Sequence, residues 1–329
     1  MRNKILVTGA DGFIGSHLIE QLVKRGFNVK AFVYYNSQNS WGWLDDIDEK
    51  IKNQIEVVAG DIRDFECVKN ALKGCDYVFN LAALIGIPYS YKSPSSYIDT
   101  NIKGIMNIMN AVKDISFSKI IHTSTSEVYG SAKFVPMTEK HQLSAQSPYA
   151  ASKIGADQLA ISYYKSFDLP VSILRPFNTF GPRQSLRAII PTIFYQILNE
   201  KKKIKLGLLT TKRDFNHVSN TTDGIISLIK NKSTAGEVFN IGYGKNVSML
   251  ELIELIKKIS RKEFEIVTDK QKLRPDKSEV QELLCDFKKI KKLNNFKPQI
   301  SLEKGLSLTY KWFKKNMHMY DDLIEKKYF

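Results

Sequence analysis

The sequence of 329 residues contains few of the side chains that build disulfide frameworks or metal centres. An odd number of cysteines, spread far apart, argues against a disulfide framework or a zinc site. The histidines lack the spacing of metal ligands. The residues concerned are Cys67, Cys75, Cys285, His17, His122, His141, His217 and His318. We therefore expect a reduced, cytoplasmic protein whose chemistry needs no metal ion.

Long apolar runs are absent as well, and no stretch reaches the roughly 20 residues that cross a bilayer as a helix. Residues Met1–Ile5 lead straight into a strand and lack the apolar core and cleavage site of a signal peptide. No internal repeat, low-complexity segment or clear linker is visible. The chain is long enough for one large domain or two, and we expect no association with membranes.

Positive charge is in excess: 49 Lys and Arg residues against 34 Asp and Glu residues give a formal net charge of +15. Such a balance can indicate a nucleic-acid partner. It is also typical of lysine-rich, solvated helix faces, with part of the charge attracting a diphosphate. The lysines are dispersed, with small clusters at Lys201–Lys203 and Lys288–Lys292, and no nucleic-acid motif accompanies them. We therefore expect no nucleic-acid partner.

The segment Gly9–Gly15, with the sequence G-A-D-G-F-I-G, follows a short apolar strand at Lys4–Thr8 and opens a helix. A strand, a glycine-rich turn and a helix N-terminus together form a cradle for a pyrophosphate. The spacing G-x-x-G-x-x-G has one residue more in its first gap than the usual dinucleotide fingerprint. It predicts a dinucleotide site that includes Gly9, Gly12, Phe13, Ile14 and Gly15.

The second strand ends at Val33 without the Asp or Glu that bonds the adenosine ribose of NAD. A carboxylate would repel the 2′-phosphate of NADP, so its absence slightly favours NADP+. No Arg follows the strand, however, and the neutral donors available are Asn36, Ser37 and Ser40. The cofactor is therefore predicted to be NAD(P)+, with a slight preference for NADP+.

Further strands are predicted with helices between them, a pattern typical of a doubly wound parallel sheet. Ligands of such sheets bind at the carboxyl ends of the strands. At that edge, small residues at Asn80–Ala83 let the backbone pass close to a cofactor, and the fifth strand delivers Ser124–Glu127. The expected strands cover residues 28–33, 55–59, 77–81, 119–124 and 171–175.

Two segments carry the candidate chemistry: T-S-T-S-E-V-Y-G at 123–130 and S-P-Y-A-A-S-K at 147–153. Tyr149 and Lys153 are four residues apart, so they share one face of a helix. A Lys ammonium beside a phenol lowers the phenol pKa and makes it a usable base. Thr125 adds a hydroxyl that can hold a substrate oxygen. Glu127 adds a carboxylate, which plain hydride transfer does not need.

Together with the glycine motif, these segments resemble the nucleotide-sugar-modifying branch of the extended short-chain dehydrogenase/reductase superfamily. The resemblance implies a Rossmann-like NAD(P)-binding domain at 1–175, to which parts of 214–242 return, and a smaller α/β nucleotide-sugar-binding domain at 176–329. It also implies a homodimer built on helices at 98–112 and 148–167. The apolar stripe of the first helix is then core or dimer seam. Further cofactor contacts that it implies are Asp61, Ile62, Leu81, Ala82, Ala83, Thr100, Ser124, Tyr149 and Lys153.

Three motifs in the second half carry the same resemblance. R-x-x-N-x-x-G-P places Asn178 where the chain passes from the cofactor half to the sugar-nucleotide half, and there the resemblance implies a substrate contact. K-R-D-F contains Arg213, and R-P-x-x-S-E-V contains Arg274. A guanidinium presents a planar fork that suits phosphate oxygens, so both arginines are candidates for binding the nucleotide diphosphate.

The resemblance implies a 4,6-dehydration with a tightly bound cofactor that is regenerated in each cycle. Tyr149 and Lys153 support oxidation at C4, and Glu127 then removes the C5 proton before water is lost. Ser126 stands where the dTDP-glucose enzymes carry an Asp, so the T-S-E sequence is closer to GDP-sugar dehydratases. The segment Tyr34–Asp46 further resembles the GDP-N-acetylglucosamine 4,6-dehydratases of legionaminic acid biosynthesis.

Three alternatives stay open. T-S-E-V-Y-G also resembles UDP-glucuronate decarboxylases, in which the same oxidation leads to loss of carbon dioxide. A nucleotide-sugar 4-epimerase would need no acid at Glu127. A non-catalytic NAD(P)-binding regulator on the same fold is expected to have lost Tyr149 or Lys153, and both are present.

Overall fold

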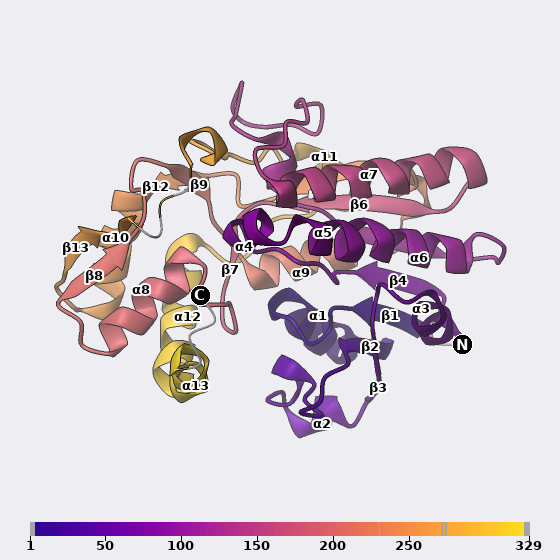
Figure 1. The fold of residues 1–329 in the computed structure, drawn as a ribbon, viewed down its shortest axis with the longest axis horizontal. Coiled ribbons are helices and arrows are strands. Elements are labelled where there is room, and N and C mark those ends of the chain that lie inside the picture. Colours follow the sequence, from indigo (N-terminus) through magenta and orange to yellow (C-terminus); the bar gives the residue numbers. More distant parts are fainter. Residues whose placement is uncertain (1–3, 230, 271–272, 274, 326–329) are drawn as a thin grey trace.

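A computed structural model describes residues 4–229, 231–270, 273 and 275–325, and its centre is a seven-stranded sheet (Figure 1). All neighbouring strands in this sheet are parallel, and their order is β11-β6-β5-β4-β1-β2-β3. The predicted doubly wound α/β fold is therefore confirmed. The strands are β1 Lys4–Thr8, β2 Asn28–Tyr34, β3 Ile55–Gly60, β4 Tyr77–Asn80, β5 Lys119–Thr123, β6 Val171–Pro176 and β11 Val238–Ile241.

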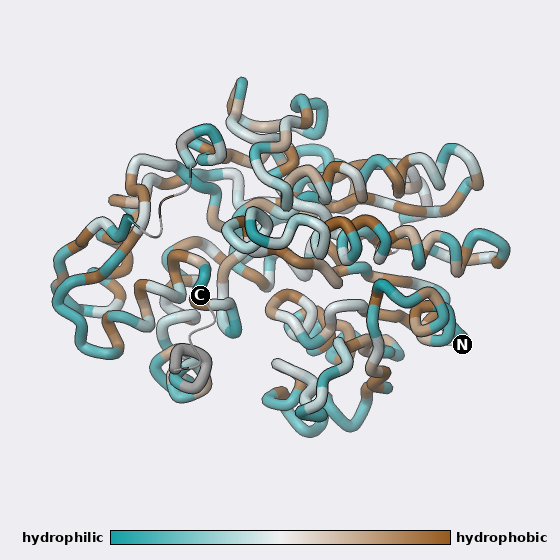
Figure 2. The backbone as a smooth tube through the Cα atoms, viewed as in Figure 1, coloured by the Kyte–Doolittle hydropathy of each residue, from teal (hydrophilic) through white to brown (hydrophobic). Residues whose placement is uncertain are grey.

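Helices cover both faces of this sheet, and an apolar core lies between the sheet and the helices on each face. One core takes buried side chains from α1, α9 and α11, and the other takes them from α3, α6 and α7. Brown and teal alternate along α6 in Figure 2, as expected for a helix with one buried apolar face. The apolar stripe of α6, formed by Ile105, Ile108 and Met109, lies in the core. The helices are α1 Phe13–Lys24, α3 Phe65–Leu72, α6 Gly104–Val112, α7 Pro148–Phe167, α9 Val218–Ser227 and α11 Lys288–Asn294.

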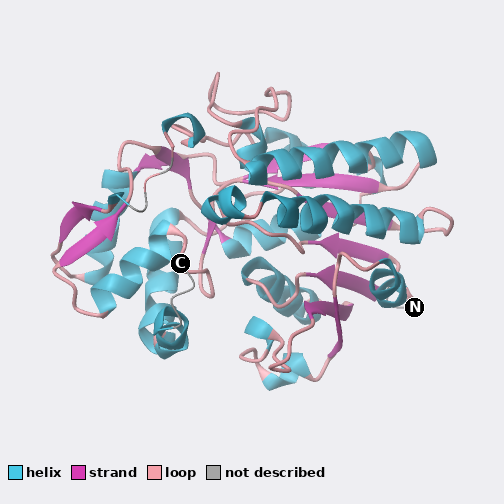
Figure 3. Ribbon diagram, viewed as in Figure 1, coloured by secondary structure: helices cyan, strands magenta, loops and turns pink. Residues whose placement is uncertain are grey.

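The described residues of the second half form three two-stranded sheets and a separate aromatic-rich core. Figure 3 shows the helices and short strands of this half beside the large sheet. Its helices are α8 Ile189–Leu198, α10 Met249–Ser260, α12 Leu302–Asn316 and α13 His318–Glu325. Its strand pairs are β7 Thr179–Phe180 with β10 Asn216–His217, β8 Lys203–Leu206 with β13 Glu265–Thr268, and β9 Lys212–Asp214 with β12 Asn246–Ser248.

Short helical elements complete the described chain. They are η1 Gly42–Leu44, α2 Glu49–Lys52, α4 Ile87–Lys92, α5 Pro94–Tyr97, η2 Ile98–Lys103, η3 Ser126–Tyr129, η4 Lys232–Thr234 and η6 Asp276–Ser278. Within the described ranges, no helix is both long enough and apolar enough to cross a membrane.

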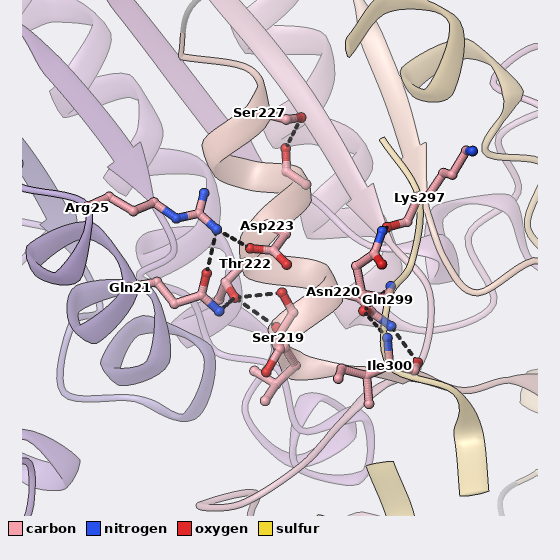
Figure 4. A network of polar contacts seen from close by, with 12 residues as sticks. Gln21, Arg25, Ser219, Asn220, Thr222, Asp223, Ser227, Lys297, Gln299 and Ile300 are labelled. Carbon is pink, nitrogen blue, oxygen red and sulfur yellow. Dashed lines mark hydrogen bonds and ion pairs between the residues drawn. The ribbon is translucent and has the colours of Figure 1, made fainter. Parts of the chain in front are cut away.

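A polar network joins α1 to α9, which is adjacent in space although Gln21 and Thr222 are 201 residues apart in sequence (Figure 4). Gln21 donates to the Thr222 hydroxyl at 2.7 Å, and Arg25 forms an ion pair with Asp223. On the far side of α9, Asn220 donates to the carbonyl of Ile300 at 2.8 Å. The helix that follows the glycine turn is thus fixed by the second half of the chain.

Candidate active site

The turn between β1 and α1 needs glycine at two positions. Gly9 has φ +66°, and a Cβ there would lie 2.8 Å from the backbone nitrogen of Ala82. A Cβ on Gly15 would lie 2.1 Å from the carbonyl oxygen of Gly9. No side chain caps the start of α1 at Gly12, which leaves its first N–H groups for an anion. These features fit the pyrophosphate of a dinucleotide.

Thr8, the last residue of β1, connects the glycine turn to the segment that follows β4. Its hydroxyl accepts hydrogen bonds from the backbone of Leu81 and Ala82, both at 3.2 Å, and donates to Asn80 Oδ1 at 2.7 Å. The strand order reverses at β1, which has β4 on one side and β2 on the other. Open α/β sheets bind their ligands at this reversal point.

The loop after β2 is held by its own side chains. The Asn36 amide donates to the carbonyls of Tyr34 and Ser40 and accepts from the backbone of Gln38 and Ser40, so its hydrogen-bonding capacity is used within the loop. Asp61, at the end of β3, forms an ion pair with Arg63, which lowers the Asp61 pKa. The expected contacts of these residues with the adenosine stay predictions.

Tyr149 and Lys153 lie in the first turns of α7, whose start is capped by the Ser147 side chain. Both are almost fully buried, with 7% and 2% exposure. Lys153 Nζ donates to the carbonyl of Thr123 at 2.7 Å, which joins α7 to the end of β5. Burial lowers the Lys153 pKa to about 8.

The expected lowering of the Tyr149 pKa by Lys153 is wrong for the protein alone. Burial raises the Tyr149 pKa, and the nearby Glu127 raises it further, whereas a hydrogen bond with Thr125 lowers it. Desolvation of the phenolate is the dominant effect here. The positive nicotinamide of a bound oxidised cofactor would add a charge that favours the phenolate.

The end of β5 brings Thr125, Ser126 and Glu127 to the same edge of the sheet. The Thr125 hydroxyl accepts from the backbone N–H of Glu127 at 3.2 Å and so caps η3. Thr125 and Ser126 are buried, and the Glu127 side chain is partly exposed. Thr123 Oγ1 is buried without a hydrogen-bond partner, which is unusual away from a binding site.

Three residues next to this site, Asn101, Ser152 and Tyr97, were missed in the sequence. The helix expected over 98–112 begins with the π-helical element η2, and there Asn101 donates to the Ser152 hydroxyl at 2.9 Å and to the Leu84 carbonyl at 3.0 Å. Ser152 in turn donates to the carbonyl of Tyr149. Tyr97 packs edge-on against Tyr149, with ring centroids 6.2 Å apart. No helical pattern signals such a bulge, although Thr100, which we singled out, is adjacent to Asn101.

Of the three predicted substrate residues, the structure describes two, and these differ in how they are held. Asn178 Oδ1 is buried without a hydrogen-bond partner, as expected of an atom that a ligand would satisfy. Arg213 forms an ion pair with Glu279 at 3.0 Å and also donates to the carbonyls of Lys212 and Gln281. Arg274 lies outside the described residues. Among the described residues, no group of three or more His, Cys, Asp or Glu side chains could hold a metal ion.

The glycine turn, the Tyr149–Lys153 pair and the parallel sheet define an extended short-chain dehydrogenase/reductase of the nucleotide-sugar type. A profile of the family described as GDP-mannose 4,6 dehydratase matches residues 6–309. The chain belongs to this family of nucleotide-sugar dehydratases and epimerases.

Relatives of both kinds are found. A UDP-glucuronate 4-epimerase from Thermodesulfobacterium geofontis is 32% identical and aligns over 95% of this chain and 97% of its own length. A dTDP-glucose 4,6-dehydratase from an Actinoplanes species is 30% identical over 95% of this chain and 98% of its own. The UDP-glucuronic acid 4-epimerase of Bacillus cereus, solved with UDP-glucuronic acid and NAD, has a TM-score of 0.86 at 30% identity, covering 95% of this chain and 99% of that structure.

Proposed function

We propose that the protein is an NAD(P)-dependent 4,6-dehydratase that converts a GDP-sugar, GDP-N-acetylglucosamine by our prediction, to its 4-keto-6-deoxy form. The observation that carries the proposal is Glu127, a partly exposed carboxylate at the end of β5 that acts electrostatically on Tyr149. Oxidation and reduction at C4 need only the phenol, the lysine and the cofactor. Removal of a proton from C5 needs a further base, and Glu127 is the side chain available for it.

In the proposed reaction, Tyr149 accepts the proton of the sugar 4-hydroxyl while Thr125 hydrogen-bonds the same oxygen. Lys153 stabilises the phenolate and would hold the nicotinamide ribose. When bound, the cofactor would supply a hydride acceptor for C4 in its oxidised form and a hydride donor for C6 in the reduced form that results. Once C4 is a ketone, the C5 hydrogen is acidic enough for Glu127 to remove it. Ser126 has no acidic proton to give, so Glu127 also protonates the departing C6 hydroxyl.

The second candidate is a nucleotide-sugar 4-epimerase, which is favoured by the names of several relatives at similar identity. An epimerase must turn the opposite face of its 4-keto intermediate toward the reduced cofactor, and it has no use for a base at C5. Decarboxylation of UDP-glucuronate and a non-catalytic role as an NAD(P)-binding regulator are the outcomes that the test must also distinguish.

The test is mass spectrometry of reactions without added cofactor. The substrates are GDP-N-acetylglucosamine, GDP-mannose, UDP-N-acetylglucosamine, UDP-glucuronate and dTDP-glucose. Loss of one water from a single GDP-sugar is the expected result. An unchanged mass with a new stereoisomer on chromatography would favour the epimerase, loss of carbon dioxide would favour the decarboxylase, and no product from any substrate would favour the regulator.

The cofactor, assembly and location belong to the same proposal. Solved relatives of this chain contain NAD, whereas the end of β2 carries no acid, so the slight preference for NADP+ stays a prediction. Release of the cofactor by denaturation and its identification by mass spectrometry would decide between the two. A homodimer in the cytoplasm also stays a prediction, and light scattering would measure the assembly.

A further inference from the structure

Asp157 is a buried carboxylate that the proposed mechanism does not use. It follows Lys153 by four residues, as Lys153 follows Tyr149, so the three side chains lie on one face of α7. Asp157 is fully buried and Lys153 is 2% exposed. An ionisable pair of this kind, shielded from solvent, interacts more strongly than the same pair at the surface.

Asp157 is held from the neighbouring strand. Arg175 in β6 contacts Asp157 Oδ2 through Nε at 3.0 Å and through its terminal nitrogen at 2.9 Å. The other terminal nitrogen of Arg175 donates to the Tyr129 hydroxyl, which donates to Asn240 Oδ1 at 2.6 Å. Burial raises the Asp157 pKa, and the charge of Arg175 opposes that rise. The two contacts from the guanidinium favour an ionised carboxylate at this position.

The second oxygen of Asp157 makes no hydrogen bond of good geometry, although the Ser124 hydroxyl is close enough to help lower the Asp157 pKa. This oxygen lies 3.7 Å from His122 Nε2. Because Asn80 Oδ1 accepts from Thr8, its amide nitrogen is the donor toward His122 Nδ1 at 3.1 Å. The histidine proton is therefore on Nε2 and faces the carboxylate.

His122 brings no charge to the group. Burial, together with the positive charges of Lys153 and Arg175, lowers its pKa well below the ordinary value. The groups around Lys153 are then Tyr149 and Asp157 from α7, neutral His122 from β5, Arg175 from β6, and Glu127 from η3, which acts on Tyr149. Asp157 is the carboxylate among them that acts on Lys153 directly.

We propose that Asp157 is a positioning residue for Lys153, because its buried carboxylate, fixed by Arg175, is the negative charge that keeps the Lys153 side chain a cation. The proposal rests on the Tyr149–Lys153 chemistry of the proposed function, and it applies equally to a dehydratase and an epimerase. Burial lowers the Lys153 pKa, and the charge of the Asp157 carboxylate raises it. Without the carboxylate, Lys153 would lose its proton at a lower pH and could no longer stabilise the Tyr149 phenolate there.

The test is an NMR titration that needs no substrate. Protein labelled with ¹³C at the lysine ε-carbon is titrated, and the Lys153 signal is assigned by its loss in Lys153→Met. We expect a midpoint near 8 for the unaltered protein. The midpoint should fall by about one pH unit or more in Asp157→Asn, and Asp157→Glu should restore most of it.

Glu127→Gln is the matched control, because it removes a nearby carboxylate that acts on Tyr149 rather than on Lys153. Its Lys153 midpoint should stay at the value of the unaltered protein. An unchanged midpoint in folded Asp157→Asn would overturn the proposal, and so would an equal shift in Glu127→Gln.

Asp157→Asn leaves Arg175 buried without its partner, so this variant can fail to fold. The double variant Asp157→Leu with Arg175→Met removes both charges and fills similar volumes. Its Lys153 midpoint should still lie below that of the unaltered protein. A midpoint equal to that of the unaltered protein would assign the effect to Arg175 and overturn the role of Asp157. A dehydratase assay that fails would leave this titration unaffected.

Discussion

The two halves of the molecule hold their candidate site residues in different ways. The catalytic candidates lie between Thr125 and Lys153, at the end of one strand and the start of the helix that follows, and backbone contacts fix them directly. The substrate candidates come from separate segments, and Arg213 depends on an ion pair with Glu279, 66 residues away. The candidate catalytic residues are thus held by the continuous sheet, and the candidate substrate residues by contacts between short, distant segments.

This difference indicates which properties are most easily changed. Substitutions at the sheet edge should abolish steps of the reaction, because no other group can replace a positioned base. Substitutions in the second half should change the affinity for the nucleotide sugar and leave the chemical steps intact. The following experiments examine that distinction, from the largest expected effect to the smallest.

The largest effect is expected for Tyr149→Phe, which removes the base for oxidation at C4 and thereby also prevents the water loss that depends on the C4 ketone. Turnover should fall by about a thousandfold or more. The ring that packs against Tyr97 is retained, so the fold should persist. Stopped-flow absorbance of the reduced cofactor measures the first step, and activity near that of the unaltered protein would reject Tyr149 as the base.

Glu127→Gln should separate oxidation at C4 from the later loss of water. Oxidation at C4 should continue, whereas water loss should slow by about a hundredfold or more, because an amide cannot remove the C5 proton. Exchange of the C5 hydrogen with deuterated water, followed by mass spectrometry, is the direct measure. Glu127→Asp is the control that keeps the charge. Unchanged dehydration in the glutamine variant would remove Glu127 from the mechanism.

Arg213→Met should raise KM for the nucleotide sugar by roughly tenfold to a hundredfold and leave kcat nearly constant, since it removes hydrogen bonds from a charged donor. Steady-state kinetics give both values. Glu279→Gln is the matched variant, because it breaks the ion pair and keeps the guanidinium, and its effect on KM should be smaller. A fall in kcat with constant KM would contradict the division between the two halves.

The smallest effect concerns stability toward acid at the boundary between the halves. Burial lowers the pKa of both His17 and His217 to about 4, against 6.5 for the unfolded chain. Below pH 6.5 the unfolded chain binds these protons first, so stability should fall as the pH drops from about 6.5 to 4 and stay level above. Each histidine should contribute roughly 1–3 kcal/mol to this loss.

Urea unfolding between pH 7 and pH 5 measures this dependence. His17→Gln should remove the His17 contribution and leave that of His217, because the glutamine side chain does not titrate. The glutamine can still donate to the carbonyl of Pro182, which His17 Nε2 contacts at 3.0 Å, so the local hydrogen bond is kept. An equal pH dependence in the variant would show that other groups cause the loss.

The sequence predicted the architecture well, because local rules control it. Parallel strands alternating with helices dictate a doubly wound sheet, and the limits expected for the helix at 148–167 match α7 closely. The π-helical turn at Asn101 could not be predicted, since it depends on contacts with Leu84 and Ser152 from other elements. The pKa of Tyr149 was also misjudged, because burial is a tertiary property that spacing does not reveal.

Asp157 is different, because its spacing from Lys153 was visible in the sequence and was overlooked. The ion pair of Arg213 with Glu279 was not visible, since neither residue has a local partner that predicts it. The assignment of residues 1–175, with parts of 214–242, to one domain and of the rest of 176–329 to another stays a prediction. In the structure, α9 and β11, which lie within 214–242, pack with the first range.

Trp43, in η1 after β2, contacts both the glycine turn near the N-terminus and the helices α12 and α13 near the C-terminus. Its ring packs against Trp312 and Tyr320 of the C-terminal helices, with both centroid distances at 5.8 Å. Its backbone N–H donates to the carbonyl of Asp11 in the glycine turn at 3.0 Å. Helices α12 and α13 therefore support the glycine turn through Trp43. Deleting these helices should increase the dissociation rate of a bound cofactor.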